Sequence, residues 1–317
     1  MIVRVTTSSR LHFGLFSFGR SEGRQYGGVG AMLERPGLRL TIERDEQTSA
    51  QGPLAERAVD FANIVAESLR SISPHRYRIT IESAPPEHVG LGTGTQLGMA
   101  ISAGALRLSG IQFPPASEFA RLPRRGQRSA IGTYGFLGGG LLLEGGKEPG
   151  KSLSPLLKRV ELPDAWRFVL LRPTNAVGLS GVEEQRAFAA MPPVPESVSQ
   201  QLQSLAEQRL LPAATFGDFE VFSHSLGRYS RLAGECFAAR QGGPYSGPQA
   251  ARLVNLLKSL GAEGVGQSSW GPTLFAVQPD QAAAETLTAK LQTLADEPLE
   301  IIISPPANRG ASVETDG

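Results

Sequence analysis

The sequence predicts an α+β protein with two domains. A chain of 317 residues is long enough to bury more than one sizeable core. Strand patterns alternate with helical ones in the first half. The second half has the order strand, helices, strand, helix, strand, which fits helices packed on one face of a sheet. We expect a first domain over residues 1–165, a second over residues 166–305, and a flexible tail of small polar residues at 306–317.

The first strand is predicted at residues 2–6 and leads into SSRLHFGLF, which carries Arg10 and His12. Arg10 can hold a phosphate through two hydrogen bonds, and His12 can donate a hydrogen bond or transfer a proton. Both are therefore candidate catalytic residues, although each can equally serve as a pairing partner within a sheet. A strand pattern at residues 38–43 and a helical pattern at 54–72 follow, and the helix carries no evident chemistry.

A glycine-rich loop within PPEHVGLGTGTQLGM, residues 85–99, joins a strand pattern at 77–83 to a helix predicted to begin near Thr95. Glycines allow a tight turn and a close approach to a ligand, and the free amides of the first helical turn attract anions. The Thr93 hydroxyl is also a candidate ligand for a magnesium ion. The alternative is a glycine turn with a threonine N-cap and no ligand. The residues of this predicted phosphate site are Gly90, Leu91, Gly92, Thr93, Gly94, Thr95 and Gln96.

Two familiar phosphate loops do not match this segment. A Walker A motif requires Lys followed by Ser or Thr after its last glycine, whereas Gln96 and Leu97 follow here. A dinucleotide-binding fingerprint normally follows the first strand of a βαβ unit, and this loop comes later in the chain.

The segment RLPRRGQR, residues 121–128, contains four arginines and is followed by Ser129. Arg128 and Ser129 are candidate ligands for a phosphate or carboxylate. A solvated basic turn is the alternative interpretation.

Glu183 and Glu184 follow two glycines at a predicted helix start, where acidic residues favour the helix dipole. One of them, for which we select Glu183, can instead act as a magnesium ligand or a proton-transfer group. Trp270 lies in a loop that turns into a strand, residues 263–277. It either offers a flat apolar face to an aromatic substrate or belongs to the core.

The loop resembles that of the GHMP kinases, P-x3-G-L-G-S-S-A, over Pro86 to Gly94, with Thr93-Gly94 in place of the two serines. Together with SRLHFGL, GGVG and RSAIGTYGF, the segment HVGLGTGTQL is similar to the β-ribofuranosylaminobenzene 5′-phosphate synthases of that superfamily. These motifs lie between Ser9 and Phe136. The resemblance implies a two-domain GHMP-kinase-like fold, with an N-terminal α/β domain, a ferredoxin-like C-terminal α/β sandwich and an active site in the cleft between them.

The resemblance also implies a function. The chain would be a pentosyltransferase that condenses 5-phosphoribosyl 1-pyrophosphate with 4-aminobenzoate or 4-hydroxybenzoate and releases pyrophosphate and CO2, in tetrahydromethanopterin biosynthesis. Mg2+ is expected, without an organic cofactor, and the family suggests a homodimer. Several GHMP kinases carry a catalytic aspartate in S-G-x-D, whereas no carboxylate occurs between Ser129 and Thr133. Its absence suits a reaction in which the carboxylate of the benzoate leaves and no ring proton is removed.

Two other functions fit parts of the pattern. An ATP-dependent GHMP kinase for a sugar, mevalonate or homoserine matches the general motif layout, but the missing aspartate and the Thr93-Gly94 pair count against it. A ligand sensor that has lost catalysis also matches the fold. The intact glycine loops and the polar residues kept in all the motifs count against it, because a non-catalytic protein would not need them.

Composition limits the possible partners. Basic and acidic residues nearly balance, 31 against 30, which disfavours non-specific binding of nucleic acid. The single cysteine, Cys236, excludes an internal disulfide framework and fits a reducing compartment. The N-terminus lacks the apolar stretch of a signal peptide, and no apolar run approaches the ~18–20 residues needed to cross a membrane. We expect a cytoplasmic protein that acts on small molecules.

Overall fold

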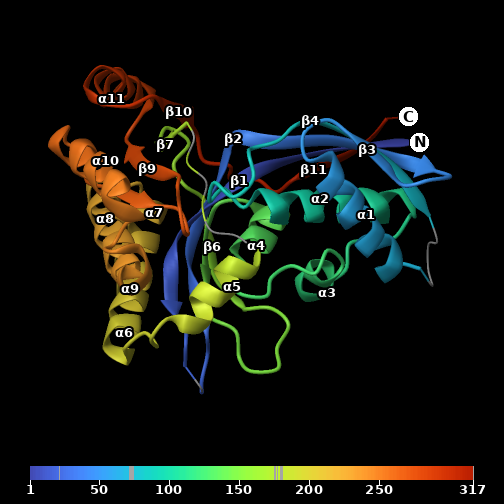
Figure 1. Ribbon diagram of the computed structural model, residues 1–317, viewed down its shortest axis with the longest axis horizontal. Helices are drawn as coiled ribbons and strands as arrows, with labels where there is room; N and C mark the ends of the chain where they lie inside the picture. The colour runs from blue at the N-terminus through green and yellow to red at the C-terminus, as the bar shows by residue number, and fades with distance from the viewer. Residues whose placement is uncertain (21, 71–74, 175, 177, 179–180, 317) are drawn as a thin grey trace.

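The structure, a computed structural model, describes residues 1–20, 22–70, 75–174, 176, 178 and 181–316, apart from the side chains of residues 182 and 185. They form a seven-stranded and a four-stranded sheet with packed helices (Figure 1). The elements of the first half are β1 (Ile2–Ser17), β2 (Tyr26–Asp45), β3 (Ser49–Gln51), α1 (Ala55–Ser68), β4 (Arg76–Ser83), α2 (Thr93–Leu108), α3 (Ala116–Arg121), α4 (Ile131–Gly138), β5 (Leu141–Glu144) and β6 (Leu156–Val160). Those of the second half are β7 (Arg167–Pro173), α5 (Gly181–Ala190), α6 (Glu196–Leu205), the π-helical turn η1 (Ala206–Leu210), α7 (Leu211–Phe216), α8 (Phe219–Glu235), α9 (Ala238–Gln241), α10 (Gly247–Ser259), β8 (Val265–Gln267), β9 (Leu274–Gln278), α11 (Gln281–Leu294), β10 (Leu299–Ser304) and β11 (Ser312–Asp316).

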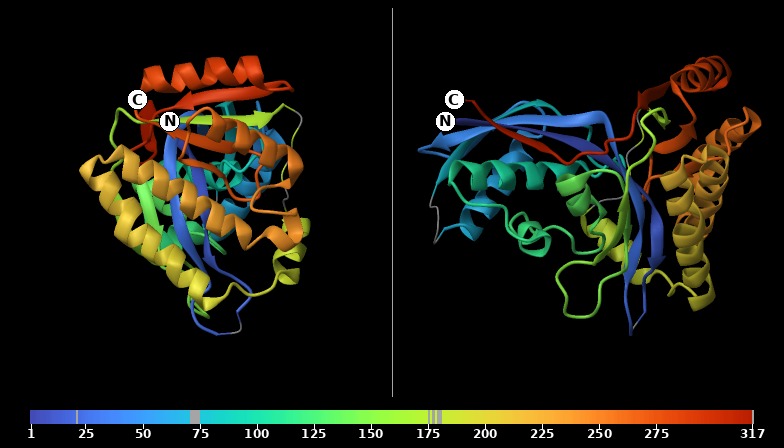
Figure 2. Two further views of the ribbon diagram at one scale, coloured as in Figure 1. Left: turned by 90° about the vertical axis from the view of Figure 1, so that its left-hand side faces the viewer. Right: turned by 180° about the vertical axis from the view of Figure 1, so that it is seen from behind.

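The long β1–β2 hairpin runs through both halves of the molecule. Burial along β1 alternates up to Arg10 and then becomes almost continuous, as expected for a strand that passes into a layer covered on both faces. The first part of β1 packs on α2, and its last part packs on α6 and α8 (Figure 2). Arg10 and His12 therefore lie where the strand passes between the two layers.

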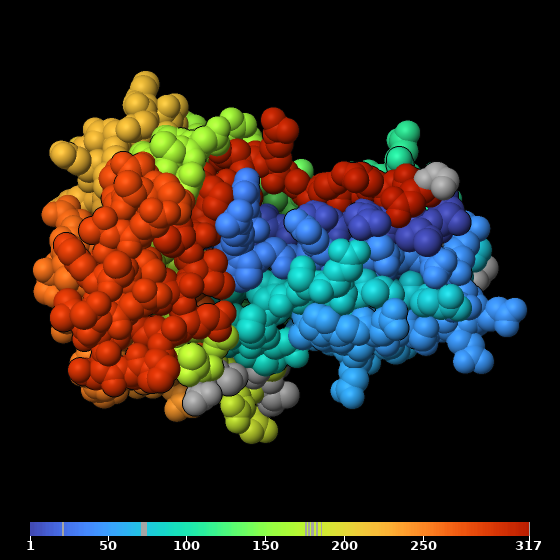
Figure 3. All heavy atoms as spheres, turned by 90° about the horizontal axis from the view of Figure 1, so that it is seen from above, coloured from blue at the N-terminus to red at the C-terminus, as the bar shows by residue number. Residues whose placement is uncertain are grey.

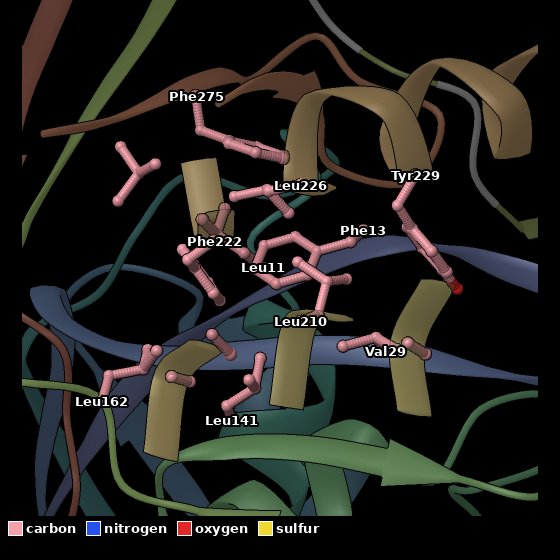
Figure 4. Packing of buried hydrophobic residues seen from close by; sticks show 14 of the residues in the cluster. Leu11, Phe13, Val29, Leu141, Leu162, Leu210, Phe222, Leu226, Tyr229 and Phe275 are labelled. Carbon is pink, nitrogen blue, oxygen red and sulfur yellow. The ribbon is translucent and has the colours of Figure 1, made fainter. Parts of the chain in front are cut away.

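A shared core ties this part of β1 to the second sheet. Leu11 and Phe13 of β1 pack with Phe222 and Leu226 of α8 and with Phe275 of β9 (Figure 4). The ring centroids of Phe13 and Phe275 lie 5.2 Å apart. Each large apolar side chain buried in this way contributes roughly 1.5–3 kcal/mol. The backbone of β1 is consequently held firmly against the loop that precedes β9.

The second sheet has the strand order β10-β7-β9-β8. Helices α10 and α11 cover one face, through side chains such as Val254 and Leu291. The opposite face carries Phe168 and Leu170, which join the core shared with β1. Successive residues from Phe168 to Leu171 are all buried, and they contact the two layers in turn, as expected for a strand covered on both faces. The predicted α+β class is confirmed.

Helix α2 starts at Thr93, two residues before the predicted start. Gly98 and Gly104 lie inside it despite their low helix propensity. A Cβ at Gly104 would lie 2.3 Å from Cγ2 of Ile42, and a Cβ at Gly98 would lie 2.8 Å from Cβ of Pro123. These glycines let the helix pack closely on β2 and on the loop after α3, which places the start of α2 next to the arginine-rich segment.

The predicted flexible tail is wrong. Residues 312–316 form β11, which pairs antiparallel with the first residues of β1, and the two segments run side by side in Figure 3. Ile2 and Thr6 pair with Asp316 and Ser312, and Arg4 lies 3.2 Å from the Asp316 carboxylate. The edge of β1 offers backbone N–H and C=O groups to which residues 312–316 bind as a strand. The sequence of the tail by itself does not reveal this partner. Within the described ranges, no helix is long and apolar enough to span a membrane.

Candidate active site

A cavity of about 1160 Å3 lies where several segments distant in the sequence meet. Residues of β1 and of the loop after α3 form much of its wall, together with residues of α1, α5 and α8 and of the loop before β9. The predicted site residues that line it are Arg10, His12, Thr95, Arg128, Ser129 and Trp270.

The glycine loop is held between β1 and the loop before β9. Gly90 has a φ of 86°, and a Cβ there would lie 2.5 Å from the Ser268 carbonyl oxygen, so only glycine fits. The Ser268 hydroxyl donates to the Gly90 carbonyl at 2.7 Å and accepts the backbone N–H of His12 at 3.0 Å. The Arg10 N–H donates to the Leu91 carbonyl at 3.0 Å. One buried serine thus fixes the loop relative to both candidate residues of β1.

The start of α2 faces guanidinium groups. A Cβ at Gly94 would lie 2.3 Å from Nη2 of Arg57 and 3.1 Å from Nη2 of Arg125. Within the part of the chain that the structure describes, neither Arg10 nor Arg125 has an ion pair, and the buried Nη1 of Arg10 and Nε of Arg125 have no hydrogen-bond partner. Burial lowers the pKa of each to about 10, although carboxylates farther away raise it. Unneutralised buried cations beside a helix N-terminus form an anion site.

Arg128 and an aromatic wall close another side of the cavity. The guanidinium of Arg128 donates to Glu184 at 2.8 Å and lies 4.7 Å from the ring centroid of Phe188. Trp270 packs edge-on against Phe188 and Phe237, with ring centroids 5.3 and 4.8 Å apart. Trp270 is buried in an aromatic cluster, as its interpretation as a core residue predicts. It also lines the cavity, and its contact with an aromatic substrate stays a prediction.

His12 is a buried, neutral hydrogen-bonding group. Its Nε2 lies 3.0 Å from the Ser129 hydroxyl, and its Nδ1 accepts the Gly14 N–H at 3.2 Å. Burial lowers the pKa of His12 and the charge of Arg10 lowers it further, whereas Glu144 raises it. The carboxylate of Glu144 is fully buried, and its Oε1 lies 3.9 Å from His12 Nε2. Sequence reasoning missed Glu144, although a carboxylate closing the apolar strand LLLE is a detectable signal.

Comparison with known proteins agrees with this geometry. Residues 211–296 match the family model described as GHMP kinases C terminal. The chain is 28% identical to the β-ribofuranosylphenol 5′-phosphate synthase of Methanothermobacter thermautotrophicus, over 97% of each chain. It is also 28% identical to the synthase of the same name from Archaeoglobus fulgidus, over 99% of this chain and 100% of the relative. The chain is thus similar to these synthases over nearly its whole length, and its residues 211–296 are similar to the C-terminal part of GHMP kinases.

Solved structures of two kinases share the fold of this chain. Homoserine kinase from Cytophaga hutchinsonii superposes with a TM-score of 0.67 at 15% identity, over 99% of this chain and 97% of the kinase. Phosphomevalonate kinase from Streptococcus pneumoniae gives a TM-score of 0.70 at 13% identity, over 97% and 100%. At such low identity the likeness concerns the fold alone.

Two residues of the glycine loop have structural partners instead of facing the cavity. Thr93 is buried, and its hydroxyl donates to the Pro86 carbonyl at 2.9 Å. The Gln96 amide accepts from the Thr7 hydroxyl and donates to the Gly132 carbonyl, which joins α2 to β1 and α4. Thr93 and Gln96 therefore do not line the cavity, because a helix start presents only part of its circumference to a ligand, and their ligand roles stay predictions. Leu91 is a core residue, and Gly90, Gly92 and Gly94 shape the site by their lack of a side chain.

The catalytic prediction for Glu183 also disagrees with the structure. Glu183 is exposed and does not line the cavity, whereas Glu184 does and pairs with Arg128. Successive helical residues point about 100° apart, so only one of the two can face inward.

The described residues show no evident cluster of magnesium ligands. The described residues contain no group of three or more His, Cys, Asp or Glu side chains that could hold a metal. With the Thr93 hydroxyl engaged elsewhere, these residues do not form a protein cage for Mg2+. The ion commonly keeps water ligands and binds through substrate phosphates, which needs only one or two protein ligands.

Proposed function

We propose that this chain is a pentosyltransferase that joins 5-phosphoribosyl 1-pyrophosphate to 4-hydroxybenzoate or 4-aminobenzoate and releases pyrophosphate and CO2. The observation that carries the proposal is a pair of largely buried guanidiniums, Arg10 and Arg125, for which the described residues provide no carboxylate partner. They lie at the start of α2 in a cavity with an aromatic wall. A substrate with several phosphate groups and an aromatic co-substrate match these two surfaces.

The charge balance supports a polyanionic ligand. Burying an unpaired cation is unfavourable unless a ligand neutralises it, and guanidinium groups bind phosphate oxygens through two parallel hydrogen bonds. Arg57 and Arg128 flank the same cavity but are paired with Glu87 and Glu184. Arg10 and Arg125 are therefore the groups whose charge is open to the substrate.

The relatives' name supports the choice of acceptor to test first. A β-ribofuranosylphenol 5′-phosphate is the product that 4-hydroxybenzoate would give once its carboxylate has left. 4-Aminobenzoate would give the corresponding aniline. Phe188 and Trp270 present ring faces or edges against which either acceptor can stack.

The proposed reaction needs little proton transfer. The bond between ribose C1 and the pyrophosphate oxygen breaks, and hydrogen-bond donors and arginines stabilise the charge that develops on the leaving group. The ring carbon that bears the carboxylate attacks the cationic C1. The bond to the carboxylate carbon then breaks, its electrons return to the ring, and CO2 leaves. No base is required to remove a ring proton, which agrees with the neutral state of His12 and with the lack of a carboxylate between Ser129 and Thr133.

The remaining expectations extend this proposal. We propose that Mg2+ enters with the pyrophosphate substrate, and we assign no step to it. Activity in the cytoplasm, a role in tetrahydromethanopterin biosynthesis and a homodimeric state are proposed from the resemblance to these relatives. The near balance of charge supports small-molecule substrates over nucleic acid.

The test uses the purified protein with Mg2+, 5-phosphoribosyl 1-pyrophosphate and each benzoate labelled at its carboxylate carbon. We expect labelled CO2 that depends on both substrates, and none when the label is in the ring instead. Absence of CO2 from both benzoates, together with ATP-dependent phosphorylation of homoserine, mevalonate or a sugar, would favour the kinase alternative.

A further inference from the structure

Glu144 is a buried carboxylate that the proposed reaction does not yet use. It ends β5 and is fully inaccessible to solvent. Its Oε2 accepts the Ala130 N–H at 2.7 Å, whereas its Oε1 has no hydrogen-bond partner among the described residues. Burying a carboxylate with one unsatisfied oxygen is unfavourable. The position of Glu144 directly behind the cavity wall therefore points to a role in the site.

The hydrogen bonds around His12 determine which ring nitrogen carries the proton. The Gly14 N–H can only donate, so Nδ1 accepts, and the neutral ring must hold its proton on Nε2. That N–H lies 3.0 Å from the Ser129 hydroxyl oxygen and 3.9 Å from Oε1 of Glu144. The negative charge of Glu144 favours this placement of the proton.

Ser129 is then oriented as a donor. Its oxygen accepts from His12 Nε2 and from the Ile131 N–H at 3.3 Å, which uses both acceptor positions of the hydroxyl. The hydroxyl proton is left to donate elsewhere, and Ser129 lines the cavity. Glu144 also fixes the backbone of this segment, because it holds the Ala130 N–H between the two residues. A donor that is oriented before the reaction stabilises developing negative charge without reorganisation.

We propose that Glu144 is a positioning residue, which acts through His12 and the Ser129–Ile131 backbone to aim the Ser129 hydroxyl at an anionic oxygen of the substrate. The inference rests on the proposed function for the identity of that oxygen, which belongs to the phosphate or pyrophosphate group. It adds a buried carboxylate–imidazole–hydroxyl series to the arginines that bind the same substrate.

The charged groups near His12 are few. Arg10 precedes it by two positions on β1 and lowers its pKa, and Glu144 on β5 raises it. The Tyr229 hydroxyl from α8 donates to the Gly14 carbonyl, and burial keeps the pKa of Tyr229 well above its ordinary value, so it stays neutral. Substitution of Glu144 by Gln removes the charge that favours His12 protonation while preserving size and an acceptor oxygen for Ala130.

The first experiment follows the His12 ring by NMR during a pH titration of the substrate-free protein, with His12→Gln used for assignment. Glu148→Gln is the matched control, since Glu148 is exposed and pairs with Arg24 at the surface. We expect a lower His12 pKa in Glu144→Gln than in wild type and in the control. Equal His12 pKa values in Glu144→Gln and wild type, or ring signals that do not respond to the substitution, would overturn the inference. This outcome is independent of whether the protein turns over the proposed substrates.

The second experiment measures CO2 release by Glu144→Gln, Ser129→Ala and the double variant. We expect kcat of Glu144→Gln to fall by about 10–100-fold with KM for 5-phosphoribosyl 1-pyrophosphate changed much less, as for other residues that orient a ligand. The double variant should lose little more than Ser129→Ala alone, because Glu144 acts through Ser129. Multiplicative losses would indicate independent roles and contradict the inference. An inactive wild type with a normal His12 response would count against the proposed function alone.

Discussion

Replacing Arg125 by Met should stabilise the substrate-free protein and weaken substrate binding at the same time. Burial and the neighbouring arginines lower the Arg125 pKa from 12.5 to about 10. A difference of about 2.5 corresponds to roughly 3 kcal/mol. At pH 7 the guanidinium is charged in both the folded and the unfolded chain, so the folded state carries the free-energy cost of burying the charge. This cost falls only above about pH 10, where the folded chain releases the proton before the unfolded chain does.

Two contributions oppose the gain. The guanidinium lies 4.8 Å from the ring centroid of Phe61, a contact that contributes roughly 0.5–2 kcal/mol. Partial solvent screening at this half-buried site reduces the electrostatic cost as well. We expect Arg125→Met to raise the free energy of unfolding by roughly 1–3 kcal/mol. Loss of charge-assisted hydrogen bonds to phosphate should weaken binding by roughly 1.5–3 kcal/mol, or about ten- to more than a hundredfold.

The assays are urea denaturation of the substrate-free protein and calorimetric titration with 5-phosphoribosyl 1-pyrophosphate. Arg124→Met is the matched control, since this neighbouring arginine is exposed and pairs with Glu67 at 3.2 Å. The control should alter stability by less than about 0.5 kcal/mol. If Arg125→Met destabilises the fold, or binds the substrate as tightly as wild type, the reasoning from an unneutralised buried cation is refuted.

Other predictions concern the loop and His12. Thr93→Val should lower the free energy of unfolding by about 1 kcal/mol, because the hydrogen bond from the hydroxyl to the Pro86 carbonyl is lost. The Mg2+ dependence of turnover should stay unchanged. A shifted Mg2+ requirement would indicate that Thr93 is a metal ligand. Gly94→Ala should displace the flexible end of Arg57 and weaken substrate binding by about tenfold, without lowering the melting temperature. Unchanged affinity would show that the start of α2 beside Arg57 is not part of the binding site. The lowered His12 pKa means that the unfolded chain binds the proton more readily, so wild type should lose stability as the pH falls below about 6.5. His12→Gln should show a weaker pH dependence between about pH 7 and 5 in denaturation curves, and an identical slope would contradict a depressed pKa.

Local sequence patterns were sufficient to predict the α+β class and the glycine loop before a helix, and they selected Arg10 and His12 as candidates, both of which line the cavity. These features depend on the conformational freedom of glycine, on periodicity within one element and on the chemistry of single side chains. Arg128, Ser129 and Trp270 were candidates because their segments combine turn residues with groups suited to anions or aromatic rings. All three line the cavity, and their binding roles stay predictions. The homologous relatives extend that agreement from motifs to nearly the whole chain.

Only the tertiary structure decided which side chains are paired and which face the cavity. Glu184 rather than Glu183 lines it because the packing of α5 sets the rotation of that helix. Among the described residues Arg125 has no ion pair, because the carboxylates nearby, which come from other segments, pair with Arg57, Arg124 and Arg128. Glu144 and His12 come close because their strands, β5 and β1, both pair with the same segment of β2. His12 lies opposite Gly30, and Glu144 lies opposite Gly28. These contacts join residues that are far apart in the sequence, and their energies depend on distances that no local pattern contains.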